Sequence, residues 1–137
     1  IEWHSSAASA GFIPVRRMLI KDLIDPLDEK EIDDLAHNAI QNLVGTAMLV
    51  IVKKHSAESA IELLERWMRI SGLPHRVEVK DDGKTYVIQH DMGRKWSYYL
   101  ARLFEDVAYE LKMIRPDIKV VEGALYVFLR DSHHAQL

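Results

Sequence analysis

Seven histidines and no cysteine decide which side-chain chemistry this chain can carry. The absence of cysteine excludes disulfides, thiolate metal sites and cysteine nucleophiles, so a metal would need histidine and carboxylate ligands. The histidines show neither the HExxH pattern nor another compact ligand spacing. We therefore expect no metal site and no cofactor. The histidines are His4, His37, His55, His75, His90, His133 and His134.

The stretch "QHDMGRKWS", residues 89–97, offers a different chemistry, which is anion binding. It joins an apolar strand-like segment to a helical one. Asp91 can cap that helix, and Gly93 permits a close backbone approach. Arg94 and Lys95 add positive charge at the positive end of the helix dipole, which is locally unfavourable. An anion or an acidic partner would relieve this conflict, whereas a capped junction with solvated basic side chains is the simpler structural interpretation.

Tyr98 extends this candidate site, because it lies on the polar side of the helix, away from the stripe that contains Trp96 and Tyr99. The candidate ligand-binding residues are His90, Asp91, Arg94, Lys95 and Tyr98.

Evidence for catalysis is weaker. No serine lies in a GxSxG-like elbow and no glycine-rich phosphate loop is present, so we name no catalytic residue. An enzyme stays open as an alternative. It would be a small metal-dependent or other enzyme that uses His90 together with His37 or His55, provided that the fold brings these side chains into one cleft.

Composition predicts one soluble domain. The chain has 137 residues, of which 48% are hydrophobic and 28% charged, and a net charge of -3 gives no general attraction to nucleic acid. The longest apolar run, residues 46–52, is far too short to cross a membrane, and no signal peptide precedes it. We expect a cytoplasmic protein with no membrane association. The first residue is Ile1, so we also expect the chain to derive from a longer protein.

Helical spacing dominates the first half. A helix is expected between Pro14 and Pro26, with a stripe facing the core. A long helix follows, with Asp28 and Glu31 as its capping pair, and a third extends from Ser56 towards Gly72. The residues of the first stripe are Val15, Met18, Leu19 and Leu23.

The second half changes to strand periodicity after residue 74. We predict a hairpin with its turn at Asp82-Gly83, a helix after Asp91, and two strands folded at Glu122-Gly123. The predicted class is α+β, in which about three N-terminal helices pack with a β-β-α-β-β unit that forms an antiparallel sheet. Residues 1–130 form one domain, with a helical part (1–72) and a sheet-plus-helix part (75–130), and residues 131–137 a flexible tail.

Two apolar segments are candidates for pairing with a second copy. Residues 47–52 are apolar on all sides, and the last strand is apolar on both faces, so each is either deeply buried or at an interface. We expect a homodimer. The candidate interface residues are Met48, Val50, Ile51, Tyr126 and Phe128.

Three stretches, "IEWHSSAASAGFIPV", "LDEKEIDDLAHNAI" and "HDMGRKWSYYL", carry a family resemblance. They resemble the region that follows a ribbon-helix-helix type DNA-binding segment in uncharacterised transcription regulators of archaea, especially ammonia-oxidising ones. The resemblance covers residue 1 to about residue 129. It implies that Glu2-Trp3 is the tail of the DNA-binding segment, whose DNA-reading strand would lie before Ile1 and is absent from this chain.

The resemblance implies a regulatory or oligomerising domain that does not bind DNA directly by itself. The possible small anionic ligand is inferred from the residues of the 90–97 junction and not from the resemblance. Ribbon-helix-helix segments read DNA as dimers, so an attached domain can set their spacing or transmit a ligand signal. Two other functions stay open, the enzyme described above and a structural protein-interaction domain with no ligand.

Overall fold

The structure is a computed structural model of the chain and describes residues 15–42, 62, 65, 66, 68, 69, 72–110 and 113–130. These residues form a mixed fold of helices and one antiparallel sheet, which confirms the α+β class. The described elements, in chain order, are α2 (Arg17–Ile24), α3 (Glu29–Asn42), β1 (His75–Lys80), β2 (Gly83–Gln89), α6 (Arg94–Glu110), β3 (Asp117–Val120) and β4 (Ala124–Arg130).

Several expectations fall outside the described residues. About three helices were expected before the sheet, and the described part of the chain contains two of them, α2 and α3. The continuation of the second helix beyond Asn42 and most of the helix expected from Ser56 lie in segments that the structure does not describe. His55, Met48, Val50, Ile51 and the tail at 131–137 lie there too.

The sheet has the strand order β1-β2-β4-β3, with every neighbouring pair antiparallel. β4 is therefore an inner strand, which is one of the two positions expected from its apolar residues on both faces. None of the helices in the described part of the chain is long and apolar enough to span a membrane.

The first hairpin forms, but its turn is one residue earlier than expected. Lys80 pairs with Gly83, so Asp81 and Asp82 are the two turn residues and Gly83 already belongs to β2. Gly83 is required for a different reason. A Cβ atom at this position would overlap the backbone carbonyl oxygen of Leu129 on the neighbouring β4.

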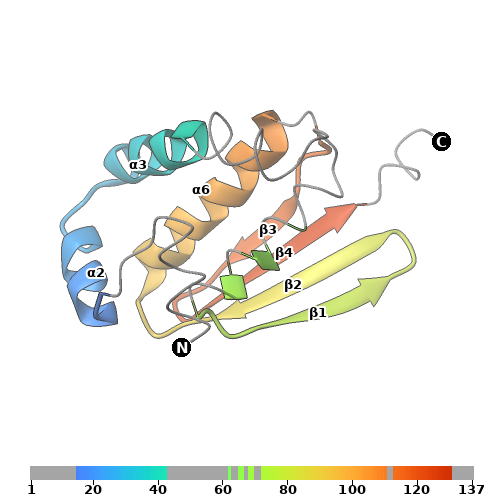
Figure 1. Cartoon of the computed structure of the whole chain (residues 1–137), viewed down its shortest axis with the longest axis horizontal. Coiled ribbons are helices and arrows are strands. Elements are labelled where there is room, and N and C mark those ends of the chain that lie inside the picture. Colours follow the sequence, from blue (N-terminus) through green and yellow to red (C-terminus); the bar gives the residue numbers. More distant parts are fainter. Residues whose placement is uncertain are drawn as a thin grey trace.

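α6 covers one face of the sheet, and α3 packs along α6 on its other side (Figure 1). The core lies between α6 and the sheet, and Leu100 and Phe104 of α6 are fully buried in it. Their spacing follows the predicted helical stripe. The sheet contributes alternate residues of its two inner strands, namely Tyr86, Ile88, Leu125 and Val127.

α3 begins with the predicted capping pair. The backbone N–H of Glu31 donates to Asp28 Oδ1 at 2.8 Å, and the backbone N–H of Asp28 donates to Glu31 Oε1 at 3.1 Å. Both amides would otherwise lack an intrahelical partner.

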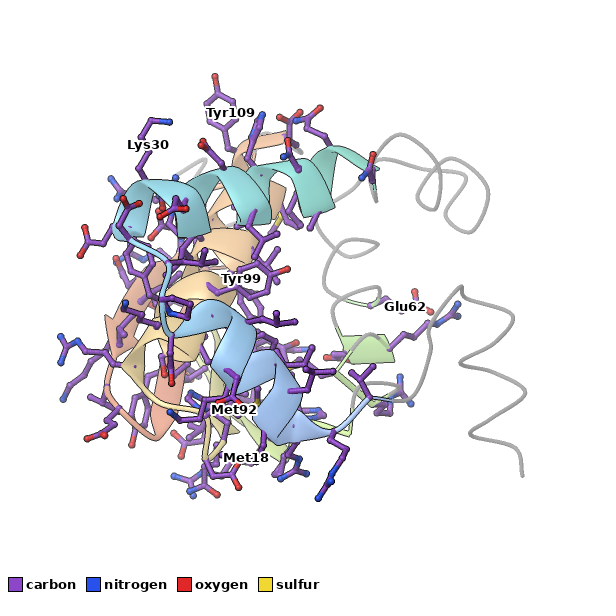
Figure 2. The ribbon with its side chains drawn as sticks, turned by 90° about the vertical axis from the view of Figure 1, so that its left-hand side faces the viewer. Met18, Lys30, Glu62, Met92, Tyr99 and Tyr109 are labelled. Atoms are coloured by element: carbon purple, nitrogen blue, oxygen red, sulfur yellow. The ribbon has the colours of Figure 1, made fainter. Side chains whose placement is uncertain are left out.

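The side of α2 that was predicted to face the core faces outwards instead. The stripe expected against the core points outwards, and Met18 and Leu23 are 60% and 59% exposed. Figure 2 looks onto the outer side of α2 and α3, where Met18 projects from the helix. Ile24 is the buried residue of α2. We name the exposed set the α2 stripe, and it consists of Val15, Met18, Leu19 and Leu23.

The second face of the sheet carries no helix of the described part of the chain (Figure 1). Residues paired across strands point to the same side of a sheet, so the registers define this face. We name it the open face. It consists of Arg76, Glu78, Lys80, Thr85, Val87, Asp117, Lys119, Tyr126, Phe128 and Arg130.

Candidate functional site

The junction between β2 and α6 is a tight turn that ends beside the β3–β4 loop. The backbone N–H of His90 donates to the carbonyl of Gly123 at 3.0 Å, which fixes the end of β2. Gly93 then takes a φ of 86°, a backbone conformation that favours glycine, and α6 begins at Arg94. This turn aims the side chain of His90 back at the first turn of α6.

His90 and Ser97 form a chain of hydrogen bonds inside this turn. His90 Nε2 lies 2.5 Å from Ser97 Oγ, and Ser97 Oγ lies 2.7 Å from the carbonyl oxygen of Val121, to which it donates. The backbone N–H of Met92 donates to His90 Nδ1 at 3.2 Å. Ser97 is fully buried, so water does not reach its hydroxyl. The hydrogen bonds of Ser97 therefore tie α6 to the β3–β4 loop in the interior of the protein.

These partners define the protonation state of His90. Because Nδ1 accepts from Met92, Nε2 carries the proton and donates to Ser97. Burial lowers the pKa of His90 below its usual 6.5, and the nearby Asp91 carboxylate opposes this shift only in part. His90 is therefore a neutral imidazole at pH 7. Each of its two ring nitrogens already makes a hydrogen bond, so neither is free to bind a metal or a substrate.

A pocket of ≈ 250 Å³ opens beside His90. Its volume suits a small metabolite, and its wall is apolar at Leu73, Pro74 and Met92. The full lining is Arg17, Leu73, Pro74, Gln89, His90, Asp91 and Met92.

Arg17 and Asp91 face each other at the rim of this pocket. Arg17 Nη1 lies 3.7 Å from Asp91 Oδ1, and both side chains are largely exposed. An exposed pair of this length contributes about 0–1 kcal/mol, so a ligand carboxylate can replace Asp91 at little cost. Asp91 was expected to cap α6, but within the described residues it accepts no hydrogen bond from Gly93 or Arg94.

Lys95 relieves the charge conflict at the start of α6 without a ligand. Its Nζ donates to the backbone carbonyls of Asp25 and Leu27, at 2.5 and 2.7 Å. These carbonyls follow the C-terminal end of α2, where the helix dipole is negative. Lys95 therefore fastens α2 to α6. Arg94 is exposed and has no partner among the residues that the structure describes.

Tyr98 likewise makes a contact between helices. Its hydroxyl donates to Asp33 Oδ1 on α3 at 2.8 Å, and burial raises its pKa to about 12, helped by this hydrogen bond. Arg102 binds the same carboxylate through Nε at 2.9 Å. Of the five candidate residues, His90 and Asp91 line the pocket, while Lys95 and Tyr98 point towards α2 and α3. Their assignment to ligand binding stays a prediction.

The histidines do not converge in the described part of the chain. His37 lies on α3 close enough to Asp106 to influence its pKa, whereas His90 precedes α6. Arg94 and Asp106 are separated by about 18 Å along the helix at 1.5 Å per residue. Among the described residues, no group of three or more His, Asp or Glu side chains could hold a metal ion.

The pocket also contains residues that the sequence had not marked, namely Arg17, Gln89 and Met92, and Ser97 lies directly behind it. A signal for Ser97 existed. It lies three and seven residues before Leu100 and Phe104, and so on the core side of α6, where a hydroxyl needs a partner. No comparable signal existed for Arg17, because its position depends on how α2 docks. Neither a protein-family model nor a curated protein sequence matches this chain.

Proposed function

We propose that this chain is the cytoplasmic regulatory and pairing domain of a transcription regulator, with a small-carboxylate site at the β2–α6 junction. α2 is the element that links the site to a second copy of the chain. The resemblance to archaeal ribbon-helix-helix type regulators supplies the biological context, in which the DNA-binding segment would precede residue 1.

The observation that carries this proposal is the two-sided character of α2. Arg17 and Lys21 lie on the side that faces the junction: Arg17 lines the pocket, and the side chain of Lys21 passes 3.8 Å from where a Cβ on Gly93 would be. The opposite side carries the α2 stripe. A helix that contacts a pocket on one side and exposes four large apolar side chains on the other is suited to convert ligand binding into a change of pairing.

The pocket chemistry favours a small carboxylate with a short apolar body. Within the part of the chain that the structure describes, the guanidinium of Arg17 is held by the weak contact with Asp91 alone. Leu73 and Met92 offer apolar wall, and Gln89 offers an amide. A bound carboxylate would draw Arg17 away from Asp91, and α2 would move with it because Arg17 is its first residue.

A matched pair of arginine variants tests this site. Arg17→Ala removes the pocket cation, and Arg16→Ala removes the same charge from the adjacent, exposed residue that does not line the pocket. We expect a carboxylate from a panel between acetate and adipate to raise the Tm of wild type and R16A by several degrees, since a ligand at 100 times its Kd adds about 2.7 kcal/mol. R17A should lose this shift. Equal shifts in R16A and R17A, or no shift with any member, would contradict the proposal.

A pairing domain with no ligand is the competing function. It is favoured by the internal hydrogen bonds of His90, Lys95 and Tyr98, each of which holds the fold together without a bound molecule. The same thermal-shift panel separates the two functions, because a ligand-free domain gives no shift while its oligomeric state is unchanged.

A further inference from the structure

The open face combines aromatic and positively charged side chains. Tyr126 and Phe128 lie two residues apart on the inner strand β4, so their Cα atoms are about 7 Å apart and their side chains are on the same side of the sheet. Tyr126 is 38% exposed, although it belongs to an inner strand. Val87 lies beside it on β2 and continues this apolar strip, but Val87 is only 3% exposed, so the accessible part of the strip is that of Tyr126 and Phe128.

Positive charge flanks this strip. The open face carries four cations against two carboxylates, whereas the whole chain has a net charge of -3. Lys119 Nζ lies 6.0 Å from the ring centroid of Tyr126, and no carboxylate of the described residues pairs with it. The Arg130 guanidinium lies 5.7 Å from the ring centroid of Phe128 and also binds Asp117 at 2.8 Å. The open face therefore has an excess of positive charge, although the chain as a whole has a net negative charge.

An exposed ring, that of Tyr126, and a partly buried ring, that of Phe128, with cations beside both match the requirements of a single-stranded nucleic acid. Bases that are not stacked in a duplex can stack on aromatic side chains, and the phosphates then meet the neighbouring cations. A duplex hides the faces of its bases, so the rings would contribute nothing to duplex binding. A second copy of the chain fits less well, because face-to-face pairing would bring two basic faces together.

We propose that the open face binds single-stranded nucleic acid, with bases on Tyr126 and Phe128 and phosphates on Lys119, Arg130 and Arg76. This activity goes beyond the proposed regulatory function. It uses neither the junction pocket nor α2, so each proposal can fail without the other.

Fluorescence anisotropy with labelled single-stranded RNA and single-stranded DNA tests it, with a duplex of the same sequence as competitor. Tyr126→Ala should weaken binding of at least one single strand by roughly five- to a hundredfold, the range of one lost base stack. Tyr109→Ala is the matched control, because Tyr109 is 81% exposed on α6, away from the sheet. Lys119→Gln should reduce the slope of log K against log salt by about 0.7, and Lys30→Gln should leave it unchanged.

Three results would overturn the proposal. They are no binding of either strand at low salt by a folded wild-type protein, equal weakening by Y126A and Y109A, and duplex binding as tight as single-strand binding. Light scattering on the same samples tests whether a second copy of the chain, and not a nucleic acid, occupies the open face. If Y126A converts a dimer to a monomer while no strand binds, the open face pairs with a second copy.

Discussion

Replacement of Ser97 by alanine tests the hydrogen-bond chain on which the junction geometry depends. S97A deletes a fully buried hydroxyl that accepts from His90 and donates to the carbonyl of Val121. Alanine fits the space and suits a helix, so the lost hydrogen bonds dominate the effect.

The magnitude follows from the two partners left behind. A buried polar group without a partner costs about 1–3 kcal/mol. The Val121 carbonyl loses a bond at 2.7 Å and keeps no other side-chain donor among the described residues, whereas half-buried His90 can turn to water in the pocket. Because the Val121 carbonyl is the group left without this hydrogen bond, we expect S97A to lower the free energy of unfolding by about 1–3 kcal/mol, against about 0.5 kcal/mol for a surface substitution.

Urea denaturation followed by circular dichroism measures this change, with Thr85→Val as the control, because Thr85 has no side-chain hydrogen bond among the described residues. A double-mutant cycle with His90→Gln gives the coupling between Ser97 and His90, expected at about 1 kcal/mol or more. A loss below about 0.5 kcal/mol in S97A, or no coupling in the cycle, would refute the reasoning.

Two further predictions concern pH and the sheet. Burial lowers the pKa of His90 in the folded protein. Below pH 6.5, His90 is therefore protonated more in the unfolded chain than in the folded protein, so the free energy of unfolding falls as the pH decreases below 6.5. The urea midpoint should therefore drop more between pH 7.5 and pH 5.5 in wild type than in H90Q, and equal drops would exclude His90 as the cause. Gly83→Ala should lower the free energy of unfolding by about 2–3 kcal/mol through backbone overlap with Leu129. Gly123→Ala, whose nearest neighbour would be the His90 carbonyl at 3.5 Å, should lower it by less than about 1 kcal/mol, so similar losses would contradict this explanation.

Local signals in the sequence predicted most of the described elements. The reciprocal pair of Asp28 and Glu31, the β1–β2 hairpin and the fold at Glu122-Gly123 each depend on residues close together in the chain. The inner position of β4 followed from its apolar residues on both faces. The exact turn was missed because the glycine at position 83 is needed where the backbone of β4 approaches it, and not for the turn itself.

The orientation of α2 and the surroundings of the candidate site depend on long-range packing, which the sequence did not reveal. The amphipathic pattern of α2 defined a stripe but not which side of the helix meets the protein, and Arg17, Ile24 and the carbonyl contacts of Lys95 decided that. The candidate site at the β2–α6 junction stays a prediction, but the surroundings of its residues differ from those expected. Lys95 is satisfied by α2 itself, and the cation that lines the pocket, Arg17, comes from more than seventy residues earlier in the chain.

The mass of the chain in solution tests most directly the claim that α2 links a ligand site to pairing. Light scattering at several concentrations should give a dimer for wild type and a monomer for Leu19→Glu/Leu23→Glu, which places two charges in the α2 stripe. Val79→Glu, an exposed apolar residue on β1, is the control and should stay dimeric. A wild-type monomer at every concentration, or a dimer that survives both charges in the stripe, would contradict the account.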